Sequence, residues 1–201
     1  SDSFALQFQD LFINELEFSD FVVDVPLVPK EFSGVIKSRS GNVLDELAFQ
    51  AKDTNGGLIK DILPDGNGSF NFDAQEDFSL EITKDFVNDR IITVRDALDA
   101  LKISLNMTKS DGTLDSLDYI AADFNRDGQV TVRDALDILK YSLGMEVSNA
   151  PEWQFVNAST DFSSLNRKDT AHLKELEFDV ASFDYSHEVT GILIGDINLT
   201  I

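Results

Sequence analysis

The chain contains no cysteine and only two histidines. The absence of cysteine excludes disulfides, thiolate nucleophiles and cysteine-based zinc or iron–sulfur sites. His172 and His187 are not accompanied by a nucleophile elbow or another catalytic motif, so we interpret both as surface residues and expect no enzymatic activity. No apolar run approaches the roughly 18–20 residues that a bilayer-spanning helix needs, so we expect no membrane insertion.

Basic residues are also scarce, because 16 Lys and Arg stand against 37 Asp and Glu, for a formal net charge of −21. Such a chain is repelled by phosphate backbones and anionic membranes, so nucleic acid is not an expected partner. The hydrophobic fraction of 42% is enough to fill a core. The acidity fits either solubility alone or the binding of hard cations, which prefer carboxylate and carbonyl oxygens. The spacing of the acidic residues has to decide between these two interpretations.

An internal repeat occupies the middle of the chain. Residues 92–105 and 130–143 are identical at 11 of 14 positions, with a constant offset of 38. Apolar residues recur in each copy at the spacing of one helical face. They are Val94, Leu98, Leu101 and Leu105 in the first copy and Val132, Leu136, Leu139 and Leu143 in the second. We therefore predict two equivalent helices that pack on each other through these two apolar stripes.

The strongest chemical signal is the twelve-residue stretch 123–134, which leads into the second helix. Oxygen-bearing side chains fall at its positions 1, 3, 5, 9 and 12, and glycine falls at position 6. Calcium is bound by such EF-hand-type loops, in which position 7 contributes its backbone carbonyl and position 12 a carboxylate. We predict a calcium site here, and the alternative is an Asx-rich turn before a helix. The predicted ligands are Asp123, Asn125, Asp127, Gln129 through its carbonyl, and Asp134.

The same offset places a weaker loop at residues 85–96. Position 3 is Val87, which cannot bind a cation, and position 6 is Arg90, for which a positive φ costs about 1 kcal/mol or more. We predict that this loop is either a weak calcium site or an empty structural partner of the other loop. Its remaining candidate ligands are Asp85, Asp89, Asp96 and the carbonyl of Ile91.

Two connections are expected around these loops. Ile92 and Val130 occupy position 8 of the two loops, where paired EF-type loops join through a short β bridge. The linker between the repeats also carries a helix candidate at Leu114–Ala122, for which Thr113 can act as N-cap. We therefore expect the two loops to lie next to each other, with a short helix between the repeats.

The repeated loop–helix pattern resembles that of dockerins, whose units follow D-x-N-x-D-G-x-x-[ST]-x-x-D before an apolar helix. Residues 123–134 fit this pattern at all of its defined positions, and residues 85–96 fit it in part. The resemblance covers about residues 85–146. It implies calcium as the cofactor, an extracellular or bacterial cell-surface location, and a protein partner that is a cohesin or a second copy. The partner-binding positions that it implies are Val94, Arg95, Val132 and Arg133.

Both flanks of the repeat are predicted to form β-structure. Apolar residues alternate at Phe4–Phe8 and Leu16–Phe18 and at several places further on, with Gly/Asn turns between them. We expect Asp65–Gly68 to be a hairpin turn rather than a cation loop. The first flank resembles the small β-sandwich of carboxypeptidase regulatory-like (prealbumin-like) domains. The end of the chain, residues 191–198, resembles C-terminal modules of very large secreted bacterial proteins.

The predicted fold class is therefore α+β, with β-sandwich-like flanks around a dockerin-like pair of loop–helix units. The expected divisions are residues 1–84, 85–146 and 147–201, and the last segment either completes the first sheet or stands alone. We expect a calcium-binding interaction or anchoring module of a secreted or cell-surface bacterial protein. The alternatives are a cellulosome-type dockerin that binds a cohesin, and a calcium-stabilised carbohydrate-binding or enzyme-accessory domain.

Overall fold

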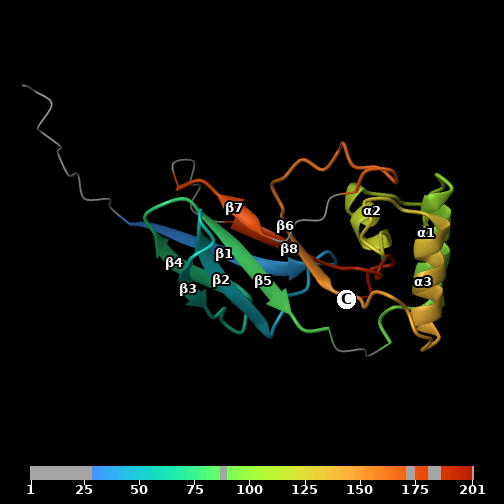
Figure 1. Cartoon of the computed structure of the whole chain (residues 1–201), viewed down its shortest axis with the longest axis horizontal. Coiled ribbons are helices and arrows are strands. Elements are labelled where there is room, and N and C mark those ends of the chain that lie inside the picture. Colours follow the sequence, from blue (N-terminus) through green and yellow to red (C-terminus); the bar gives the residue numbers. More distant parts are fainter. Residues whose placement is uncertain (1–28, 87–89, 171–174, 181–186, 201) are drawn as a thin grey trace, which may run out of the picture.

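The computed structural model describes residues 29–86, 90–170, 175–180 and 187–200. This part of the chain forms two four-stranded sheets and three helices, in line with the predicted α+β class (Figure 1). The elements are β1 (Lys30–Ser38), β2 (Leu47–Asp53), β3 (Leu58–Ile62), β4 (Ser69–Ala74), β5 (Phe78–Lys84), α1 (Val94–Ser104), α2 (Ser116–Ala122), α3 (Val132–Ser142), β6 (Trp153–Asn157), β7 (Leu176–Phe178) and β8 (His187–Leu193).

Strands from both flanks of the repeat share these two sheets. One sheet has the order β4-β1-β8-β6 and the other the order β3-β2-β5-β7. β1 and β8 come from opposite ends of the described chain and run parallel, with Gly34 opposite His187. The chain thus leaves the sheets after β5, forms the helices, and returns at β6. The strands expected at Phe4–Phe8 and Leu16–Phe18 lie outside the described residues.

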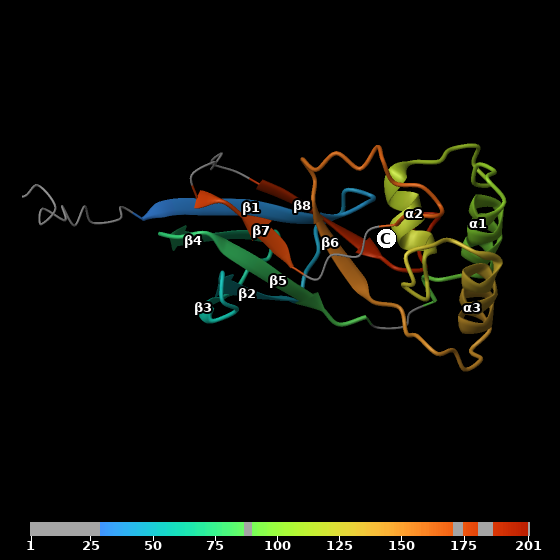
Figure 2. The same ribbon diagram turned by 45° about the horizontal axis from the view of Figure 1, so that its top comes forward.

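The two sheets face each other across one hydrophobic cluster (Figure 2). Buried residues alternate with half-buried ones along β1 and with exposed ones along β4, as expected for strands with one face turned to a core. The ring of Phe32 in β1 lies 5.1 Å from that of Phe78 and 4.8 Å from that of Phe178, both in the opposite sheet. Phe49 and Phe70 meet across the same gap at 5.2 Å. Phenylalanine therefore fills most of the space between the sheets.

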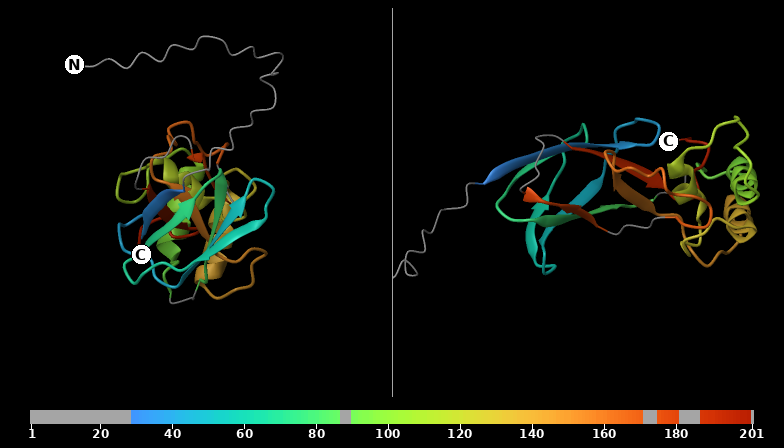
Figure 3. Two further views of the ribbon diagram at one scale, coloured as in Figure 1. Left: turned by 90° about the vertical axis from the view of Figure 1, so that its left-hand side faces the viewer. Right: turned by 90° about the horizontal axis from the view of Figure 1, so that it is seen from above.

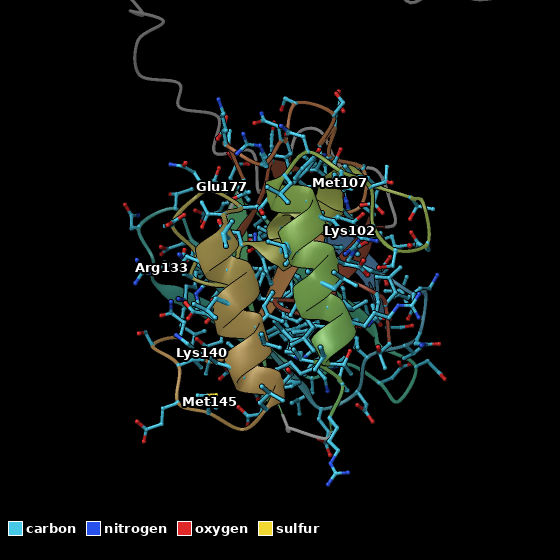
Figure 4. The ribbon with its side chains drawn as sticks, turned by 90° about the vertical axis from the view of Figure 1, so that its right-hand side faces the viewer. Lys102, Met107, Arg133, Lys140, Met145 and Glu177 are labelled. Atoms are coloured by element: carbon cyan, nitrogen blue, oxygen red, sulfur yellow. The ribbon has the colours of Figure 1, made fainter. Side chains whose placement is uncertain are left out.

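The helices form one end of an elongated molecule, and α2 lies between the sheets and the other two helices (Figures 1 and 3). α1 and α3 lie side by side and antiparallel, since Met107 after α1 and Met145 after α3 are at opposite ends of the pair (Figure 4). A second hydrophobic cluster joins the three helices to the end of β8, where Ile192, Ile194 and Ile197 are fully buried. No helix in the described ranges is long and apolar enough to cross a bilayer.

The apolar stripes predicted to join α1 and α3 instead face outward, so this expectation was wrong. Their six outermost side chains are between 48% and 60% exposed, while Leu101 and Leu139 are half-buried. The buried face is made of alanine and isoleucine, and the alanines let the helix axes approach closely. The buried residues are Ala97, Ala100, Ile103, Ala135 and Ile138. The repeated helices do pack on each other, but six of the eight residues of the predicted stripes remain on the surface.

Two local predictions also need correction. α2 begins at Ser116, and its N-cap is Asp115 rather than Thr113, because the Asp115 carboxylate accepts hydrogen bonds from the first free amides of the helix. The turn at Asp65–Gly68 connects β3 and β4, which belong to different sheets, so it is not a hairpin. Asp65 Oδ1 instead accepts the amides of Asn67 and Ser69, and this closes a tight turn between the sheets.

Candidate metal centre

The loop 123–134 connects α2 directly to α3. Two of its residues adopt the left-handed conformation, Arg126 with φ of 61° and Gly128 with φ of 88°. Gly128 thus provides the sharp turn predicted at position 6, because glycine takes a positive φ without steric cost. At the end of the loop, Thr131 is the N-cap of α3, and Asp134 completes a capping box with it. The sequence therefore folds this stretch into a closed loop whose last acidic residue lies in the first turn of a helix.

The acidic residues at positions 1 and 12 are both fully buried, with 0% exposure for Asp123 and Asp134. Asp123 accepts the loop amides of Asp127 at 3.2 Å and Gly128 at 2.9 Å. Asp134 Oδ1 accepts the amide of Asn125 at 3.1 Å. The two carboxylates thus both accept hydrogen bonds from backbone amides of the same loop.

Burial raises the pKa of Asp134 above its usual range. Hydrogen bonds from Asn125 and Thr131 oppose this rise, and the negative charge of Asp123 adds to it. The Asp123 charge therefore acts on Asp134. Burial of a carboxylate is unfavourable unless hydrogen bonds or positive charge compensate it. An oxygen-binding cation between the two carboxylates would remove this cost.

The other predicted ligands lie nearer the surface. Asn125 is half-buried, while Asp127 and Gln129 are exposed. Asn125 Oδ1 accepts the amide of Asp127 at 2.9 Å, and Asp127 Oδ1 accepts the amide of Gln129 at 3.0 Å. These successive turns bring every second side chain back over the loop. Within the described residues, however, three or more Asp, Glu, His or Cys side chains do not converge closely enough to hold a metal ion.

The loop is braced by a distant segment that the sequence did not indicate. The amide of Val130 donates to the carbonyl of Arg167 at 2.7 Å, and the amide of Thr170 donates to the carbonyl of Gly128 at 3.0 Å. The expected bridge from Val130 to Ile92 is therefore wrong, because Arg167 occupies that edge. Thr170 Oγ1 also donates to Asp123 Oδ2 at 2.6 Å. No local pattern could reveal these contacts, since Thr170 lies 47 residues after Asp123.

The first repeat has a different arrangement at the corresponding residues. Asp96 is fully buried, and its Oδ1 accepts the backbone amides of Ile197 at 2.8 Å and Asn198 at 2.9 Å. These two amides thus donate to Asp96 at the position where the amide of Asn125 donates to Asp134. Asp85 is exposed after β5, Ile91 packs against the helical core, and Asp89 lies outside the described residues. Arg90 does adopt the positive φ, 68°, that position 6 requires.

α2 begins with a third aspartate of the same kind. Asp118 is fully buried at the third position of the helix, and its Oδ2 accepts the amide of its N-cap residue. Its Oδ1 accepts from Arg39 Nη2 at 2.7 Å and from Lys109 Nζ at 2.9 Å. Here two side-chain cations neutralise the carboxylate and tie the end of β1 to the helices.

The four positions predicted to bind a partner are all exposed at the outer ends of the helix pair. Val94 and Arg95 start α1, and Val132 and Arg133 start α3. Figure 4 shows the two helices side by side on this face, with Lys102, Arg133 and Lys140 around them. The structure therefore brings the equivalent residues of both repeats onto one surface.

No protein-family model, curated protein or solved structure matches this chain. The geometry of the loop and of the helix face therefore carries the functional inference.

Proposed function

We propose that this chain is a calcium-binding protein-interaction module. One calcium ion in the loop 123–134 holds the start of α3, and the outer face of α1 and α3 binds a protein partner. The observation that carries the proposal is the pair of neighbouring, fully buried carboxylates of Asp123 and Asp134. Oxygen ligands of this kind suit calcium, and a divalent cation would offset the cost of burying two negative charges.

The ion would be held by the residues that the loop spacing selects. Asp123 and Asp134 supply buried carboxylates, and Asn125 and Asp127 supply side-chain oxygens that lie nearer the surface of the loop. The backbone carbonyl of Gln129 completes the set proposed from the sequence. Bound calcium supplies positive charge and a rigid junction between α2 and α3.

The proposed partner surface is an apolar patch with a basic border. Exposed apolar side chains gather on the outer face of the helix pair, an arrangement typical of interaction sites. They are Val94, Leu98, Leu105 and Met107 from the first repeat and Val132, Leu136, Leu143 and Met145 from the second. Arg95, Lys102, Arg133 and Lys140 border them in a chain of net charge −21. A partner with an apolar patch and an acidic rim would fit this face.

An extracellular or bacterial cell-surface setting follows from this proposal and from the dockerin resemblance. Calcium outside cells is at millimolar concentration, so it can saturate a site of modest affinity. A hundredfold excess of calcium over the dissociation constant stabilises the folded state by about 2.7 kcal/mol. The module would then gain much of its stability only after export.

Isothermal titration calorimetry of calcium into chelator-treated protein tests the metal site. We expect one site, which is lost in Asp123→Ala and in Asp134→Ala. Asp111→Ala and Asp161→Ala are matched controls, because these exposed aspartates also close turns through backbone amides but lie outside the loop. Binding that survives both loop substitutions, or no binding by the wild-type protein, would refute the site.

A separate measurement tests the partner surface. Leu98→Glu combined with Leu136→Glu places charge in the centre of the patch, and Leu63→Glu is the control, since Leu63 is an 87% exposed leucine in the β3–β4 connection. We expect all changes to leave the free energy of unfolding within about 0.5 kcal/mol of wild type. Sedimentation measures self-association, and calorimetry measures binding to a cohesin domain. Whichever of these the wild-type protein shows should be lost in the double variant and kept in Leu63→Glu. Equal association of the double variant and wild type would exclude this face.

A further inference from the structure

The segment 166–170 forms a compact hairpin of its own before it meets the loop. The amides and carbonyls of Asn166 and Asp169 are paired in both directions, at 3.1 and 3.0 Å. Leu165 packs against the helical core, and Arg167 Nε donates to Asn106 Oδ1 at 2.7 Å after the end of α1. We name residues 166–170 the brace. The brace is thus fixed both to its own turn and to the helices.

The brace lies along the edge of the loop 123–134 and reaches its first acidic residue. Val130 and Gly128 exchange backbone hydrogen bonds with Arg167 and Thr170. Thr170 is only 8% exposed, and its hydroxyl donates to Asp123 Oδ2 at 2.6 Å. The same oxygen accepts the amide of Gly128 at 2.9 Å. Asp123 is therefore oriented by its own loop on one side and by the brace on the other.

We infer that the brace is a positioning element for the calcium site, and that calcium binding and docking of the brace reinforce each other. This inference rests on the proposed calcium function and concerns its regulation. Hydrogen bonds to a ligating carboxylate fix its orientation, and loss of such an outer partner typically lowers metal affinity 10- to 100-fold. If docking of the brace raises calcium affinity, calcium must stabilise the docked brace by the same factor.

The first test is calcium calorimetry on Thr170→Val, which keeps the side-chain shape and removes the hydroxyl. We expect its calcium dissociation constant to rise about tenfold or more. Thr170→Ser restores the donor and should restore the affinity. Thr113→Val is the matched control, because the Thr113 hydroxyl also donates to an aspartate, Asp111 at 2.8 Å, but away from the loop. Circular dichroism in chelator verifies that each variant is folded.

The second test can be read from the wild-type protein alone, and Thr170→Val serves as a comparison. Trypsin can cut after Arg167 and Lys168 only when the brace leaves the loop and becomes extended. We expect calcium to slow cleavage at these two bonds at least tenfold, and Thr170→Val to lose most of this protection. Peptide mass spectrometry identifies the cut bonds.

The outcomes separate the two proposals. If the wild-type protein binds calcium, but Thr170→Val binds it equally well and calcium does not slow cleavage at the brace, the inference is overturned and the calcium site stands. If the wild-type protein binds no calcium, the proposed function fails and this inference fails with it.

Discussion

Replacement of Asp134 should destabilise the protein in a calcium-dependent way, whereas replacement of the equivalent Asp96 should have the same effect with and without calcium. Both residues are fully buried at the third position of a repeated helix, and both accept the amide and the hydroxyl of the threonine N-cap. The donors to their other carboxylate oxygen differ. Asp96 Oδ1 accepts two backbone amides, from Ile197 and Asn198, whereas Asp134 Oδ1 accepts the amide of Asn125. Identical Ala substitutions therefore compare a structural aspartate with a proposed metal ligand.

The expected magnitudes follow from these contacts. Asp96→Ala leaves the buried amide of Ile197 without its acceptor, which costs roughly 1–3 kcal/mol, and loses a capping interaction of about 1 kcal/mol. We expect a total loss of about 2–4 kcal/mol in both calcium and chelator. Asp134→Ala loses a similar cap, but it also removes a carboxylate whose burial next to Asp123 is unfavourable. The loss of unfolding free energy in Asp134→Ala should therefore be smaller than that in Asp96→Ala when both are measured in chelator. At a hundredfold excess of calcium, the loss in Asp134→Ala should be about 2.7 kcal/mol larger than in chelator.

Urea unfolding of both variants and wild type, each with calcium and with chelator, measures these differences. The decisive quantity is the change in the free energy of unfolding that calcium produces in each protein. Wild type and Asp96→Ala should be stabilised equally by calcium, and Asp134→Ala should not be stabilised. A smaller calcium stabilisation in Asp96→Ala than in wild type would show that the first loop also binds calcium. Full stabilisation of Asp134→Ala would place the ion elsewhere.

Three further predictions concern the frame around the site. Asp118→Ala leaves Lys109 and Arg39 buried without their shared carboxylate, so urea unfolding should show a loss of about 3–5 kcal/mol; a loss below 1 kcal/mol would contradict the described ion pairs. Gly195→Ala should destabilise more than Gly56→Ala in the same assay, because both have positive φ but only at Gly195 would the new Cβ lie 2.8 Å from Ile92. The amides of Ser69 and Asn67 hold the pKa of Asp65 below its usual range, so the carboxylate stabilises the fold above its unfolded pKa, and this is lost as pH falls through the folded pKa. Asp65→Ala should therefore lower the melting temperature at pH 7, and the difference should shrink in acid; a difference independent of pH would contradict this account.

Local sequence was sufficient for the features that depend on neighbouring residues. The two repeated helices occur where the periodicity placed them, and Gly128 provides the turn expected at position 6. Thr131 and Asp134 form the capping box that their spacing allows. Each of these features depends on contacts within about four residues, so the sequence pattern contains the necessary information.

The surroundings of the site could not be derived in this way. Thr170 and Arg167 reach the loop from a hairpin that has no distinctive motif, and Ile197 reaches Asp96 from a segment 101 residues further along the chain. Periodicity also failed to assign the faces of α1 and α3, because each helix has two apolar faces. The smaller face, with Ala97 and Ala135, is buried because it allows close packing, and the larger leucines remain outside.

The three helix-starting aspartates differ in what surrounds their second carboxylate oxygen, and this difference supports the calcium proposal for the loop 123–134. Asp96, Asp118 and Asp134 each place one oxygen on their own helix start, as the local sequence requires. The partners of the second carboxylate oxygen depend on which segments the fold places next to it. At Asp96 the partners are a pair of amides, and at Asp118 they are a pair of cations. At Asp134 the partner is one loop amide beside a second buried carboxylate, an arrangement that a divalent cation would complete.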